Sequence, residues 1–176
     1  AAEDMKFIVT NHADNLILQT RAHHGQLSSM ADVKANTLIT LSSVLLTLSV
    51  PRVQRDGDHW ALVVLMIFSL VTILLASYAA MPKYEGRKSR AAVVKGEKPH
   101  FNVLFYGHFS ELSYEDYKNA MEVVLKDPDL SYEAQLREIH SMGVFLAHTK
   151  YRFLRLAYFA FMLGLITSLL TYVLIG

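Results

Sequence analysis

The run WALVVLMIFSLVTILLASYAAM, residues 60–81, decides the fold class. Its 22 residues include no Asp, Glu, Lys, Arg or His. As an α-helix, a run of this length measures about 33 Å, which exceeds the roughly 30 Å hydrocarbon thickness of a bilayer. Residues 60–81 are therefore predicted to form a membrane-spanning helix.

Two further stretches extend this prediction. Residues 156–176 also lack charged side chains and follow a basic cluster that contains Lys150. Residues 35–50 are shorter and carry six Ser or Thr, so they predict either a full or a partial span. Hydroxyl side chains allow close packing and hydrogen bonding between helices in lipid, which favours a position inside a bundle. The predicted fold is an all-α membrane protein with three transmembrane helices.

Composition excludes several other classes. The chain has 176 residues, 52% of them hydrophobic, a formal net charge of +1 and no cysteine. Disorder, disulfide scaffolds, thiolate zinc sites and general nucleic-acid binding are excluded. A soluble bundle with three buried helices is the alternative, but a chain this short has too few residues to surround three such helices.

The distribution of Lys and Arg predicts the orientation. Residues 1–34 contain three, the loop 51–59 two and residues 82–155 twelve. Basic residues favour the cytoplasmic side, so the N-terminus is expected in the cytoplasm. The predicted order is a cytoplasmic amphipathic helix 1–34, a first span 35–50, an external loop 51–59, a second span 60–81, a cytoplasmic basic segment with helices 82–155, and a third span 156–176.

The cytoplasmic segments are predicted to be helical. Apolar and small residues recur every three or four positions over residues 6–34, which indicates one helix leading into the first span. Ser113 and Asp116 match a capping box for a helix that ends before the Asp-Pro-Asp sequence 127–129. From Ser131 the pattern predicts one long helix of about 45 residues continuing into the third span.

No catalytic motif is evident. The sequence lacks the GxSxG, P-loop, GxGxxG and HExxH patterns. The adjacent His23 and His24 would point about 100° apart on a helix, which disfavours joint metal coordination. We therefore expect neither an enzyme nor a metal or other cofactor.

The basic segment after the second span is a candidate anion site. Residues 83–98 carry six bases against two acids. A phosphate would pair with these bases, and nearby aromatic rings would stack on a nucleobase. The candidate ligand-binding residues are Arg87, Lys88, Arg90, Phe105, Tyr106 and Phe109. The alternative is that these bases only contact anionic lipid headgroups.

Charged residues at the entrance of the first span form a second candidate site. Asp32 and Lys34 lie where a charge is costly unless it is paired or reaches the interface. One interpretation is an ion pair across helices with Arg152 or Arg155. The other is a snorkelling lysine beside a solvated aspartate.

Three short segments together resemble the Pycsar membrane effectors, the PycTM family. They are MADVKAN at 30–36, FYGHF at 105–109 followed by LS and EDY within 112–117, and AHTKYRFLR at 147–155. The resemblance covers nearly the whole chain and implies a bacterial antiphage effector of the inner membrane. Such effectors respond to a cyclic pyrimidine mononucleotide, cyclic UMP or cyclic CMP, made by a partner cyclase. They then impair the membrane and kill the infected cell. The resemblance assigns no binding residue.

The expected function is therefore a ligand-gated membrane effector that acts as a homo-oligomer in the lipid bilayer. The alternative is a non-enzymatic membrane scaffold or sensor whose cytoplasmic helices recruit a protein partner. A membrane-bound hydrolase would need a catalytic cluster that the sequence does not reveal.

Overall fold

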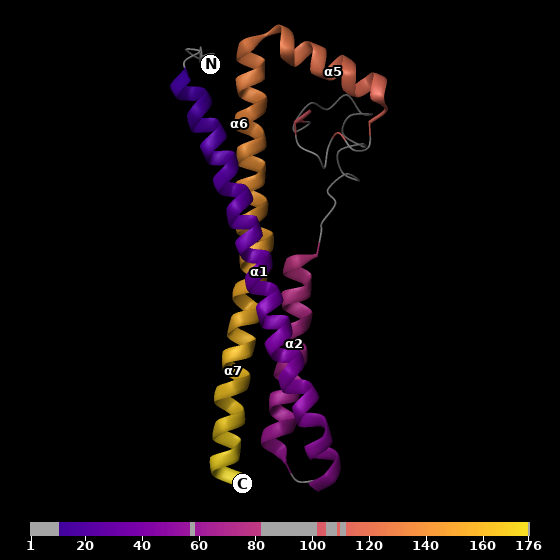
Figure 1. Ribbon diagram of the computed structural model, residues 1–176, viewed down its shortest axis with the longest axis vertical. Coiled ribbons are helices and arrows are strands. Elements are labelled where there is room, and N and C mark those ends of the chain that lie inside the picture. The colour runs from indigo at the N-terminus through magenta and orange to yellow at the C-terminus, as the bar shows by residue number, and fades with distance from the viewer. Residues whose placement is uncertain (1–10, 57–58, 82–101, 105–108, 110–111, 176) are drawn as a thin grey trace, which may run out of the picture. The chain divides into compact units, whose positions relative to one another are not determined.

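The computed structural model describes residues 11–56, 59–81, 102–104, 109 and 112–175 (Figure 1). The chain divides into unit 1, Ala1–Gly25 with Pro82–Val144, and unit 2, Gln26–Met81 with Phe145–Gly176. The elements are α1 (Asn11–Asp56), α2 (Trp60–Ala80), α5 (Tyr114–Lys126), α6 (Pro128–Phe145), the π-helix η1 (Leu146–Tyr151) and α7 (Arg152–Ile175). The described residues contain no strand, which confirms the all-α prediction.

Helix α1 continues past the point where the sequence predicted a loop. The external loop was expected to begin at Pro51, but Pro51 lies inside α1, which ends at Asp56. Proline has a φ close to the helical value, but inside a helix it removes the hydrogen bond to the carbonyl four residues earlier and its ring crowds that carbonyl. The helix nevertheless continues beyond Pro51 to Asp56. The prediction that the loop starts at Pro51 is therefore wrong.

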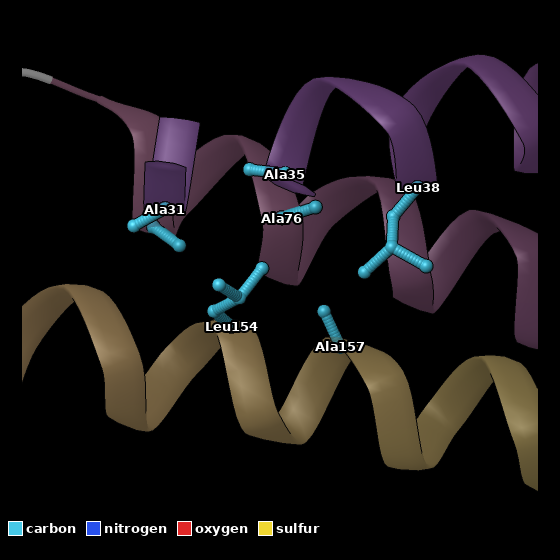
Figure 2. Packing of buried hydrophobic residues seen from close by; sticks show 7 residues of the cluster. Ala31, Ala35, Leu38, Ala76, Leu154 and Ala157 are labelled. Atoms are coloured by element: carbon cyan, nitrogen blue, oxygen red, sulfur yellow. The ribbon is translucent and has the colours of Figure 1, made fainter. Parts of the chain in front are cut away.

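Small side chains form the core of unit 2. Figure 2 shows residues of α1, α2 and α7 converging on one cluster. Its buried members are Ala31, Ala35, Leu38, Ala76, Ala79, Leu154 and Ala157. Gly164 of α7 lies so close to Phe68 of α2 that an added Cβ would overlap the phenylalanine Cβ. Such small residues allow close helix packing, which is the usual source of attraction between helices in lipid.

Large apolar side chains in unit 2 face outward instead. Exposed examples include Ile67 and Leu74 on α2 and Phe159 and Ile166 on α7. A soluble bundle would bury such residues and expose polar ones. Among the described residues, three helices are long and apolar enough to cross a membrane. The alternative of a soluble bundle is therefore wrong, and the prediction of three membrane-spanning helices is confirmed.

The helix boundaries in unit 1 follow the capping signals in the sequence. The Ser113 hydroxyl accepts a hydrogen bond from the Asp116 amide at 3.2 Å and donates to the Asp116 carboxylate at 2.7 Å. Helix α5 ends at Lys126, and the Asp127 carboxylate accepts from the Asp129 amide at 3.0 Å. Pro128 occupies the first position of α6, where the missing amide hydrogen costs nothing.

Within unit 1, polar contacts join the first part of α1 to α6. The Tyr132 hydroxyl donates to the Asp14 carboxylate at 2.5 Å. The Arg21 Nε donates to the Glu138 carboxylate at 2.6 Å. The hydrogen bond to the Asp14 carboxylate raises the pKa of Tyr132, because it stabilises the protonated phenol. The face of α1 in this unit is therefore held by specific polar pairs as well as by the buried Ile17.

Candidate functional site

A charged contact joins α1 to the π-helix inside unit 2. The Lys150 ammonium donates to both carboxylate oxygens of Asp32, each at 2.7 Å. It also donates to the Ser28 hydroxyl at 2.9 Å. These three contacts match the three donors of the ammonium group. Only 9% of Lys150 is exposed, whereas the Asp32 side chain is 41% exposed. We call Ser28, Asp32 and Lys150 the polar junction.

Helix register explains why these residues meet. On α1, Ser28, Asp32 and Ala35 follow one another at steps of four and three, and therefore share a face. Lys150 precedes Leu154 and Ala157 at the same steps. Ala35, Leu154 and Ala157 belong to the small-residue cluster (Figure 2). The polar junction thus continues the face that packs the three helices together.

The π-helix η1 contributes a second polar contact. The Tyr151 hydroxyl donates to the Leu27 carbonyl at 3.1 Å. Single-turn π-helices inside longer helices are rare and often mark functional positions. Lys150 and Tyr151 both lie in η1 and both bind α1.

The sequence predicted an ion pair with Arg152 or Arg155, and this choice of cation is wrong. Asp32 pairs with Lys150, whereas Arg152 and Arg155 are exposed. At about 100° per residue, Arg152 lies about 200° around the helix from Lys150 and points away from α1. Lys34 is also exposed, because it lies off the face that carries Ala31 and Ala35. Lys150 belonged to the basic cluster seen in the sequence. Its spacing of four residues from Leu154 and seven from Ala157 was the signal that would have singled it out.

Most predicted ligand-binding residues lie outside the described part of the chain. These are Arg87, Lys88, Arg90, Phe105 and Tyr106. Phe109 is described and half-buried, and its ring centroid lies 5.2 Å from that of Tyr117 in α5. Phe109 therefore packs on an aromatic ring of unit 1.

Asn102 is a structural residue that was not predicted from the sequence. Its side-chain amide donates to the Ala134 carbonyl of α6 at 2.9 Å, and its side-chain oxygen accepts from the Leu104 amide at 3.0 Å. Asn102 and Val103 are both buried. An Asn that bonds the backbone two residues later is a turn signal. The chain is therefore fixed to α6 just before the predicted aromatic segment 105–109.

No group of three His, Asp or Glu within the described segments is placed to hold a metal ion. The polar junction combines a buried cation with a partly hydrated anion. Breaking such a pair is costly, whereas its net contribution to stability is small, so it is suited to specify one arrangement of two helices.

Three apolar spans, an outward-facing apolar surface and a small-residue core define a multi-pass helical membrane protein. The family model described as the Pycsar effector protein domain, PycTM, matches residues 16–175. The chain therefore belongs to this family, as the sequence resemblance indicated. Its role is that of an effector in antiphage defence, and membership implies a cyclic-nucleotide signal from a cyclase. No curated protein and no solved structure matches the chain.

Proposed function

We propose that this protein is a non-catalytic effector that binds a cyclic pyrimidine mononucleotide, cyclic UMP or cyclic CMP, and then impairs the inner membrane of the infected bacterium. The observation that carries the proposal is the family match over residues 16–175 in a chain with three membrane-spanning helices. Loss of membrane integrity would end the infection by killing the cell.

The ligand would act on the cytoplasmic side. Residues 1–34 and 82–155 carry most of the basic residues, and basic residues favour the cytoplasmic face. A cyclic mononucleotide offers one phosphate and one base. We assign the phosphate to Arg87, Lys88 or Arg90 and base stacking to Phe105, Tyr106 or Phe109.

The polar junction is the element through which binding would alter the spans. A ligand shifts a conformational equilibrium only by its difference in affinity for the two states. A shift from 1:99 to 99:1 needs about 5.5 kcal/mol, which several subunits binding together would supply. Lys150 and Tyr151 of η1 hold α1 at the start of the small-residue core, so rearrangement of η1 would release α1 for repacking.

Calorimetry of the detergent-purified protein tests ligand binding. We expect heat of binding with cyclic UMP or cyclic CMP and none with cyclic AMP or cyclic GMP. Arg87→Ala is expected to weaken binding about tenfold or more, because an arginine–phosphate contact contributes about 1.5–3 kcal/mol. Arg137→Ala is the matched control, because this exposed base pairs with Glu133 within α6.

Two results would count against the proposal. A protein that binds neither cyclic pyrimidine nucleotide would contradict it directly. Equal binding by wild type and Arg87→Ala would remove Arg87 from the site.

A second candidate is a scaffold that recruits a protein partner. Tyr114, Val123 and Leu125 of α5 are exposed apolar residues, which is the observation that favours it. Replacing Val123 and Leu125 together by Asp would then abolish defence while leaving nucleotide binding unchanged. Under the effector proposal, by contrast, loss of binding and loss of defence go together.

A further inference from the structure

One buried hydroxyl in the spans has no hydrogen-bond partner. Ser42 of α1 is fully buried, at 0% exposure, and its Oγ is closed to water as well. Among the residues that the structure describes, none donates to this oxygen or accepts from it. A hydroxyl without hydrogen bonds in an apolar interior raises the free energy of the arrangement that buries it, because its bonds to water have been lost.

Two other buried hydroxyls in the spans are satisfied. Ser49 of α1 and Thr72 of α2 are both buried. Each donates to the carbonyl four residues earlier, at 2.7 Å for Ser49 and 2.8 Å for Thr72. A bond of this kind satisfies a hydroxyl within its own helix. Ser42 makes no such bond to the Leu38 carbonyl, so it differs from these two residues in its hydrogen bonding and not in its burial.

Helix packing holds Ser42 in this state. It follows Leu38 by four residues and Ala35 by seven, so it lies on the face of α1 that packs against α2 and α7 (Figure 2). On α2, Thr72 precedes Ala76 by four residues, and the two helices run in opposite directions (Figure 1). Ser42 and Thr72 therefore both lie one turn beyond the small-residue core. The Ser42 hydroxyl stays covered only while α1 remains packed on the other two spans.

Separation of α1 from α2 and α7 removes this cost. Once α1 moves away, the Ser42 hydroxyl reaches water, a partner on another helix or the carbonyl four residues earlier. The missing hydrogen bond therefore destabilises the packed arrangement but not the separated one. A free-energy difference of this kind shifts the equilibrium between the two arrangements towards separation.

We propose that Ser42 is a built-in destabilising element that lowers the free energy needed to separate α1 from α2 and α7. The small-residue core and the polar junction hold the packed arrangement, and the unsatisfied hydroxyl offsets part of their effect. Ser42 acts through helix packing and is therefore a positioning residue. Its part in activation rests on the proposed function, in which α1 is released for repacking.

Thiol labelling of the nucleotide-free, detergent-purified protein tests the inference, because the chain contains no cysteine. Leu154→Cys places a reporter thiol in the small-residue core, at a position that is 3% exposed and reacts with a maleimide only after the helices separate. We expect Ser42→Ala to slow labelling of this reporter about tenfold, which corresponds to about 1.4 kcal/mol. Ser49→Ala is the matched control, because it removes a buried serine hydroxyl that is satisfied within α1, and it is expected to leave the labelling rate unchanged.

Unfolding by a denaturing detergent gives a second measurement that needs no reporter. We expect a higher unfolding midpoint for Ser42→Ala than for the wild type, whereas Ser49→Ala is expected to show no increase. Equal labelling of Ser42→Ala and the wild-type background, equal slowing by both alanine variants, or an unfolding midpoint that Ser42→Ala does not raise would each overturn the inference. Neither measurement uses a nucleotide, so a failure of the proposed function, seen as absent nucleotide binding, is a separate result.

Discussion

Asp32→Ala is expected to destabilise the protein by about 2 kcal/mol. The substitution leaves the buried Lys150 ammonium with Ser28 as its only partner at the polar junction. Removing one partner of a fully buried pair typically costs about 3–5 kcal/mol, and the 41% exposure of the Asp32 side chain reduces this figure. Unfolding of the detergent-purified protein by a denaturing detergent measures the difference.

Lys150→Met is the matched comparison. Methionine keeps the apolar stem, and the remaining Asp32 carboxylate is partly hydrated, so this variant is expected to lose less stability than Asp32→Ala. The double variant, Asp32→Ala with Lys150→Met, is expected to recover most of the loss, because no charge is left unpaired. A double variant that is less stable than Asp32→Ala alone would show that the charge pair is not the source of the effect.

Gly164→Leu is expected to have the largest effect on the spans. Even the Cβ of alanine at this position would overlap the Phe68 Cβ, and Phe68 Cγ would lie only 3.1 Å away. Overpacking a tight contact typically costs about 1–3 kcal/mol, and the leucine side chain would force α2 and α7 apart. The same unfolding measurement, made on Gly164→Ala and Gly164→Leu, is expected to show progressive destabilisation.

Gly25→Ala is the control for glycine replacement itself. An added Cβ at Gly25 meets no atom within 4 Å. Alanine is about 0.8–1 kcal/mol more favourable than glycine inside a helix, so this variant is expected to gain stability. If Gly164→Leu unfolded at the same detergent concentration as the wild type, the close approach of α2 and α7 would be contradicted.

Much of the fold follows from local patterns in the sequence. The uncharged run 60–81 identifies α2 by length alone, and Ser113 and Asp127 set the boundary residues of α5 and α6 through their caps. The long helix expected from Ser131 is present as α6, η1 and α7 in succession. These features depend on residues close in sequence, which is why periodicity and capping rules detect them.

The contacts between helices were harder to predict from the sequence. Pairing of Asp32 with Lys150 depends on which residues of two distant segments share inward faces, and the sequence offered three neighbouring bases as partners. The π-helix η1 lacks a local signal, because its residues LAHTKY include neither Gly nor Pro to mark a departure from the α-helix. Gly164 also gave no signal, because its importance comes from the position of Phe68 on another helix.

The predicted ligand site depends on residues that mostly lie outside the described segments. Asn102 and Phe109 show how the chain on either side of 105–108 is fixed to α6 and α5. Assignment of Arg87 and its neighbours therefore stays a prediction that rests on charge and aromatic composition.

Under the proposed function, a cyclic pyrimidine mononucleotide makes this protein permeabilise a membrane. Dye release from liposomes that contain only the purified protein tests that claim. We expect rapid release after addition of cyclic UMP or cyclic CMP to the face that carries residues 82–155, and none with cyclic AMP or from protein-free liposomes. Liposomes that bind the nucleotide yet retain their dye would contradict the claim.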